Sequence, residues 1–71
     1  MKLKDFIESL IFDFKNSVSY TVYEDGKKFH IDSEINTPEL IIKDIGHKNI
    51  DRWKIEHNSF KNRTYVHIYV G

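Results

Sequence analysis

The first fifteen residues carry apolar side chains at the spacing of an amphipathic helix. Six of them recur at positions i, i+3, i+4, i+7, i+8 and i+11, which forms a single stripe along one side of a helix. Asn16 can adopt the left-handed conformation that ends a helix, and Lys15 is favourable at the negative end of the helix dipole. The pattern predicts a helix over residues 2–15. The stripe consists of Leu3, Phe6, Ile7, Leu10, Ile11 and Phe14.

Two alternating runs follow, and they flank the dipeptide Asp25-Gly26. Asp-Gly tolerates positive φ at both central positions of a type I′ turn, so residues 18–33 are predicted to form a β-hairpin. A two-residue loop fixes the register, because it decides which residues lie opposite each other. The predicted partners are Val22 with Phe29, Tyr20 with Ile31, Val18 with Ser33, Thr21 with His30, Tyr23 with Lys28, and Ser19 with Asp32.

Residues 37–46 open with Thr37 before Pro38 and close on Gly46. A capping Thr, a Pro at the first helical position and a closing Gly together indicate a short second helix. The three consecutive apolar residues 40–42 are also compatible with a strand or an irregular crossover, so both helix and strand stay open for residues 38–45.

The last part of the chain has a second hairpin pattern. In the closing run 63–70, Val66, Ile68 and Val70 alternate with three polar aromatic residues. A four-residue loop at 59–62 would place Trp53 opposite Ile68 and Ile55 opposite Val66 on the core side. On the other side, the predicted partners are Lys54 with His67, Arg52 with Tyr69, and Glu56 with Tyr65.

The element order is therefore helix, hairpin, helix, hairpin, or αββαββ. We expect an α+β fold of two layers, in which both helices cover one face of a four-stranded antiparallel sheet. A chain of 71 residues has little room for a second domain, so residues 1–71 are expected to form one. The other face of the sheet would then be open.

Composition excludes several classes of function. Eleven basic residues balance eleven acidic ones, which argues against tight binding of duplex nucleic acid. The chain has no cysteine, so disulfides and thiolate metal sites are excluded. Its apolar runs are too short to cross a membrane, and acidic residues interrupt the first ten positions, unlike a signal peptide. We expect a cytoplasmic protein that does not bind membranes.

The open face is the candidate binding surface. Aromatic rings with cations between them can stack bases and neutralise phosphates, as single-strand-binding sheets do. The same residue types are also common on the solvent side of a strand, where cross-strand pairs account for them without a ligand. A solvent face, a protein-binding face and a nucleic-acid face therefore remain three interpretations. The candidates are Tyr23, Lys28, His30, Arg52, Lys54, Tyr65, His67 and Tyr69.

The sequence offers little chemistry for an enzyme. None of the four histidines has a partner at metal-ligand spacing, and no nucleophile elbow or glycine-rich phosphate loop is present. We expect neither catalysis, nor a metal site, nor a cofactor.

Three segments resemble a class of small proteins encoded by phages and prophages of AT-rich Gram-positive bacteria. They are 1-MKLKDFIESL, 23-YEDGKKF and 37-TPELIIKDI, followed by a closing alternating strand. Some small phage proteins of this size inhibit host defence or host enzymes, so the resemblance implies an accessory protein that binds a protein partner. It brings no functional residues with it.

Three hypotheses follow from the sequence. The first is a non-enzymatic module that binds a protein partner of unknown identity. The second is a weak binder of single-stranded nucleic acid that uses the open face. The third is a structural homodimer joined by strand edges or by the open face, which would compensate for a small core.

Overall fold

The computed structural model describes residues 1–9, 18–32 and 34–71. Along the chain it contains α1 (Leu3–Glu8), β1 (Val18–Glu24), β2 (Lys27–His30), α2 (Pro38–Ile45), β3 (Ile50–Asn58) and β4 (Arg63–Val70). The predicted α+β fold and the order of its elements are confirmed. The first helix is confirmed from Leu3 to Glu8, and residues 10–15 of the prediction lie outside the described residues.

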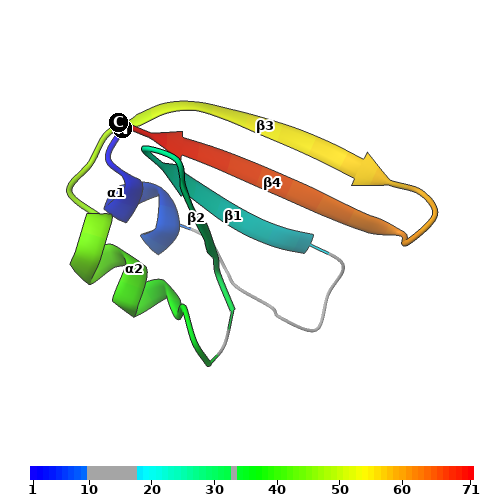
Figure 1. Ribbon diagram of the computed structural model, residues 1–71, viewed down its shortest axis with the longest axis horizontal. Coiled ribbons are helices and arrows are strands. Elements are labelled where there is room, and N and C mark those ends of the chain that lie inside the picture. Colours follow the sequence, from blue (N-terminus) through cyan, green and yellow to red (C-terminus); the bar gives the residue numbers. More distant parts are fainter. Residues whose placement is uncertain (10–17, 33) are drawn as a thin grey trace.

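The strands form one sheet in the order β2-β1-β4-β3 (Figure 1). Both hairpins are antiparallel, but β1 and β4 at the centre run parallel. The prediction of an all-antiparallel sheet is therefore wrong, and the sheet is mixed. The reason lies in the connection through α2, which crosses one face and leaves β2 and β3 at opposite edges. Parallel neighbours require such a crossover, whereas a tight turn joins antiparallel ones.

The two turns set the predicted registers within each hairpin. Asp25 and Gly26 both have positive φ, as a type I′ turn requires, and Asn62 does so at the end of the second loop. All five predicted pairs between β3 and β4 are present, and so are three between β1 and β2. The latter are Thr21 with His30, Val22 with Phe29, and Tyr23 with Lys28.

The first hairpin departs from its prediction beyond His30, where β2 ends. The Ile31 N–H still donates to the Tyr20 carbonyl, at 3.0 Å. The predicted pair of Ser19 with Asp32 is not formed. Instead, Asp32 Oδ1 accepts the N–H groups of the three residues 34–36, at 2.8, 2.6 and 3.1 Å, and these bonds lower the pKa of its carboxyl. The predicted pair of Val18 with Ser33 lies outside the described residues.

The second helix, left open by the sequence, is α2. Thr37 caps it, because its Oγ1 accepts the N–H of Leu40 at 3.4 Å, and Pro38 occupies the first turn. The first helix has no side-chain cap. Its leading N–H groups donate instead to the segment after α2, from Leu3 to the Lys48 carbonyl at 2.8 Å and from Lys4 to the Gly46 carbonyl at 2.9 Å.

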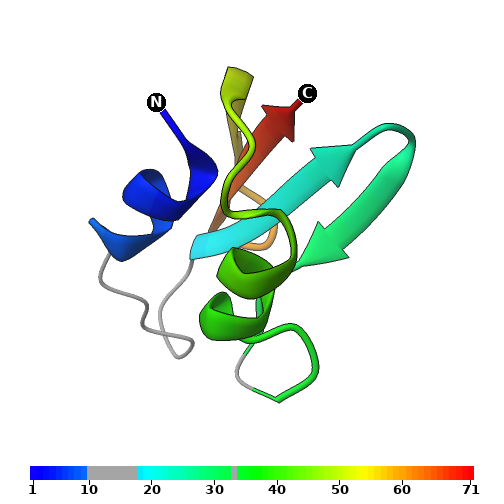
Figure 2. The ribbon, with the colours of Figure 1, turned by 90° about the vertical axis from the view of Figure 1, so that its left-hand side faces the viewer.

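Both helices lie on one face of the sheet, as Figure 2 shows. Among the described residues, the fully buried core between the helices and the sheet is small and aliphatic, and the central strands supply its middle. The partly buried side chains of Phe6, Tyr20 and Phe29 pack against it. The buried residues of the core are Leu3, Ile7, Val22, Ile31, Ile41, Ile45, Ile68 and Val70.

The core does not include Trp53 and Ile55, which were predicted to be buried in it. They are 59% and 66% exposed. They do lie on the helix side of the sheet, since the Phe6 ring of α1 stacks on Trp53 with centroids 6.2 Å apart. The prediction was wrong about how far the two helices cover the sheet. β3 is an edge strand, and the β3–β4 hairpin extends past both helices (Figure 1).

Candidate binding surfaces: the open face and the β3 edge

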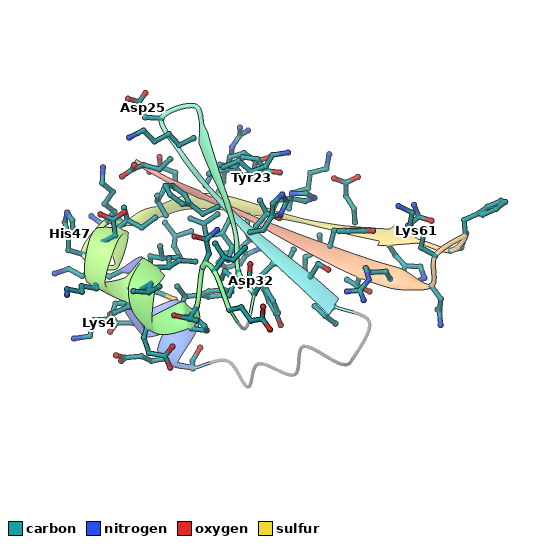
Figure 3. The ribbon with its side chains drawn as sticks, turned by 60° about the horizontal axis from the view of Figure 1, so that its bottom comes forward. Lys4, Tyr23, Asp25, Asp32, His47 and Lys61 are labelled. Atoms are coloured by element: carbon teal, nitrogen blue, oxygen red, sulfur yellow. The ribbon has the colours of Figure 1, made fainter. Side chains whose placement is uncertain are left out.

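The sheet face opposite the helices is the open face predicted from the sequence. Figure 3 shows Tyr23 on the side of the sheet away from the helices, with Lys61 at the far end of the β3–β4 hairpin. All eight candidate residues lie on this face, and every strand contributes to it. They are Tyr23 from β1, Lys28 and His30 from β2, Arg52 and Lys54 from β3, and Tyr65, His67 and Tyr69 from β4.

Four of these side chains form a column across the strands. Tyr23 and Tyr69 stack with ring centroids 4.7 Å apart and planes 12° apart. Arg52 lies over the Tyr69 ring at 4.3 Å, and Lys28 lies over the Tyr23 ring at 5.9 Å. The four are direct cross-strand neighbours in the sheet register. The stack therefore combines one aromatic pair with two cation–π contacts, both of which stabilise the sheet itself.

This column limits what the tyrosines can bind. The Tyr23 ring lies between Lys28 and Tyr69, and the Tyr69 ring lies between Tyr23 and Arg52. Base stacking needs a ring face that is free to receive the base. A nucleotide would have to displace a cation or separate the two rings before it could stack here.

A second row of contacts runs from Tyr23 of the column through His67 to Glu56 and Lys54. The Tyr23 hydroxyl lies 2.8 Å from His67 Nδ1, and His67 Nε2 lies 3.1 Å from Glu56 Oε1. A carboxylate only accepts, so His67 Nε2 carries a proton and donates it to Glu56. Lys54 Nζ is 3.5 Å from the same carboxylate oxygen.

The hydrogen bonds that link Tyr23 through His67 to Glu56 do not activate the Tyr23 hydroxyl as a nucleophile. Burial raises the pKa of the Tyr23 hydroxyl, and Tyr69 and Glu56 raise it further, against the opposing effect of Lys54. The hydroxyl therefore stays protonated and acts as a hydrogen-bond donor. Its role is to hold His67 in one orientation.

The remaining candidates lie on either side of these rows. His30 Nδ1 is 3.0 Å from the Oγ1 of Thr21, which is almost fully buried. Tyr65 is half-buried opposite Glu56 of β3 and Ser19 of β1. Nearby, Arg63 donates to the Ser19 hydroxyl at 2.7 Å. The open face is thus closely bonded within the chain.

The second surface, the β3 edge, was not predicted as a binding site. We define it as Arg52–Asn58 with its outward backbone edge. All seven residues are exposed, and no described strand pairs with the side of β3 that faces away from β4. Trp53 and Ile55 project from it on the helix side. Beside Trp53 is an open, mainly apolar hollow of about 500 Å³, lined by Met1, Ile50, Asp51, Arg52 and Trp53.

Sequence reasoning missed this edge because alternation gives the face of a residue but not the position of its strand in the sheet. The loop at 59–62, predicted only as a connection, adds a further exposed apolar side chain, because Phe60 is fully exposed. One signal was available. β3 carries a charged residue at three alternate positions, Arg52, Lys54 and Glu56, and edge strands often carry charge.

Comparisons with known proteins add no further assignment: no family model, curated protein or solved structure matches the chain. Within the described ranges, no three histidine, aspartate or glutamate side chains gather as metal ligands. No helix in the described part of the chain is long and apolar enough to cross a membrane.

Proposed function

We propose that this domain is a non-enzymatic interaction module that binds a protein partner along the β3 edge. One observation carries the proposal. A nine-residue strand at the edge of the sheet is exposed along almost its whole length and has an exposed tryptophan and isoleucine on one side. An edge of this kind is a ready template for pairing with another strand.

Strand addition explains how such an edge would bind. Unpaired N–H and C=O groups of β3 supply backbone hydrogen bonds to an extended segment, and side chains on alternate positions supply specificity. Tryptophan is enriched among the residues that dominate binding energy at interfaces. Trp53 is supported from below by Phe6, so its ring is already positioned before a partner arrives. The partner we propose is an extended segment with apolar side chains at alternate positions.

The open face supports the alternative, single-stranded nucleic acid, less well. It carries Lys28, Arg52 and Lys54, but the ring faces of Tyr23 and Tyr69 are already in contact with cations and with each other. The phage or mobile-element setting suggested by the resemblance remains a prediction, and it agrees with a protein that acts by binding another protein.

A displayed library of random peptides about ten residues long tests the proposal, because strand addition needs only an extended segment. Peptides selected on the wild-type domain should alternate apolar and polar residues. Their binding should shift the fluorescence of Trp53 to shorter wavelength, and Trp53 is the single tryptophan of the chain.

A matched pair of substitutions locates the site. Ile55→Lys places a charge in the middle of the β3 edge, and it should weaken binding of the selected peptides about tenfold or more. Ile35→Lys is the control, because Ile35 is also largely exposed, at 75%, but lies before α2. Equal binding by wild type and Ile55→Lys would overturn the proposal, as would peptides whose binding depends on Tyr69.

A further inference from the structure

The β3 edge is complementary to itself when two copies meet antiparallel. From the geometry we infer that a second copy of this chain binds there, with Ile55 opposite Ile55 of the second copy. This inference rests on the proposed function, since it names the partner of the same edge. It follows from the order of charged and apolar side chains along β3.

The two sides of the edge are matched in this register. On the open-face side, Lys54 lies opposite Glu56 of the second copy and Glu56 lies opposite its Lys54. The two-fold axis therefore adds two ion pairs between the copies to the contact that Lys54 and Glu56 make within each chain, at 3.5 Å. On the helix side, the two Ile55 side chains meet at the centre, and each Trp53 lies opposite His57 of the second copy. Opposite charges directly across a ladder are favourable, and like charges are unfavourable.

The neighbouring registers are penalised by charge. A shift that centres the pairing on Lys54 puts two lysines directly opposite each other at the two-fold axis, and this repulsion opposes the two attractive pairs of Arg52 with Glu56 of the second copy. A shift that centres it on Glu56 does the same with two glutamates. Centring on Trp53 places Arg52 opposite Lys54 of the second copy, twice. Among the four registers centred from Trp53 to Glu56, the register centred on Ile55 alone has no like-charge pair.

The backbone of β3 agrees with this register. The ladder between β3 and β4 shifts between Ile50 and Arg52, and such an irregularity bends the strand. From Arg52 to Asn58 the ladder is regular. Antiparallel pairing centred on Ile55 uses this regular stretch, because it ends with Arg52 opposite Asn58 of the second copy.

Pairing at β3 would also bury apolar side chains that the small core of the domain leaves exposed. The domain has a core of eight buried aliphatic residues among those described, while Trp53 and Ile55 remain largely exposed. Joining two β3 edges brings both pairs together on the helix side around the two-fold axis. Small domains commonly gain stability by association when their own core is limited.

Charge-exchange variants test the register. Lys54→Glu alone and Glu56→Lys alone each turn two ion pairs into two repulsions, and each should raise the dissociation constant of the dimer about tenfold. The double variant Lys54→Glu with Glu56→Lys restores both pairs with reversed sign and should dimerise like wild type. An equimolar mixture of the two single variants should form a mixed dimer, since both of its pairs are then attractive.

The measurement is mass by light scattering and sedimentation over a range of about 10 μM to 1 mM, where a weak dimer responds to concentration. Melting temperatures at the lowest concentration show whether each variant still folds. This control is needed because Glu56 also contacts His67 within the chain. If the dissociation constant of the dimer is the same in the single variants as in the wild type, the register is wrong. A wild-type monomer at the highest concentration would overturn self-association.

The two proposals fail differently. If the wild type is a monomer but selected peptides still bind in an Ile55-dependent way, self-association is wrong and the binding edge stands. If a dimer forms that Ile55→Lys does not weaken, the second copy binds elsewhere and this inference is wrong.

Discussion

Tyr23 and Tyr69 stack across the junction of the two hairpins, with ring centroids 4.7 Å apart. Tyr23 belongs to β1 and Tyr69 to β4, the central strands that run parallel. The contact therefore joins halves of the chain that the two turns do not connect. On the opposite face Val22 and Ile68 are direct neighbours and fully buried, so the junction is fixed from both sides.

This stacking predicts energetic coupling between the two tyrosines. In a double-mutant cycle with Tyr23→Leu and Tyr69→Leu, the free energies of unfolding should depart from additivity by about 0.5–1.5 kcal/mol. Urea unfolding of the four proteins measures the coupling. Tyr65→Leu is the control partner for Tyr69→Leu, and additive effects of Tyr23 and Tyr69 would contradict a stack that holds the hairpins together.

The position of β3 at the edge predicts unequal roles for two isoleucines on the same side of the sheet. Ile68 is fully buried, so Ile68→Ala should lower the free energy of unfolding by about 2–5 kcal/mol. Ile55 is 66% exposed, so Ile55→Ala should cost less than about 1 kcal/mol when measured on the monomer. Denaturant titration at low protein concentration measures both. Similar losses at the two positions would mean that the helix layer covers β3.

The ion pair between Glu24 and Lys48 predicts a dependence of stability on pH. Lys48 Nζ lies 2.8 Å from Glu24 Oε2. Their hydrogen bond lowers the pKa of the Glu24 carboxyl below 4.5 and raises the pKa of Lys48 above 10.5. Glu24 has a lower pKa folded than unfolded. Its stabilisation is therefore complete above the unfolded value of 4.5 and is lost as pH falls through the folded one.

The Lys48 shift gives the corresponding alkaline limit. The pKa of Lys48 is higher in the folded state, so the same stabilisation is lost as pH rises above 10.5 through the folded value. Glu24→Gln should flatten the fall of the melting temperature below pH 4.5, whereas the exposed-residue control Glu34→Gln should not. If the melting temperature of Glu24→Gln falls below pH 4.5 as steeply as that of the wild type, other carboxyls control acid unfolding.

Local signals explain which parts of the fold were predictable. The dipeptide Asp25-Gly26 and the loop at 59–62 fix their own hairpins, because a turn dictates which neighbouring residues pair. Thr37 and Pro38 likewise mark the start of α2. The parallel pairing of β1 with β4 has no local signature, since it depends on how α2 carries the chain across the sheet.

The same distinction applies to the candidate surfaces. Alternation correctly placed Tyr23, His67 and Tyr69 on one face, because side chains in a strand point to opposite faces in turn. It could not show that Tyr23 and Tyr69 stack, which follows from the non-local β1–β4 pairing. Nor could it show that Trp53 is exposed, since exposure depends on where the helices end over the sheet.

Concentration-dependent amide NMR spectra of the wild-type domain show directly whether a second copy binds at the β3 edge. Between about 10 μM and 1 mM, we expect the signals of Arg52–Asn58 to move with increasing concentration, while those of β2 and of Tyr23 stay in place. Signals that do not move, or that move instead around Tyr23, His67 and Tyr69, would contradict binding at this edge.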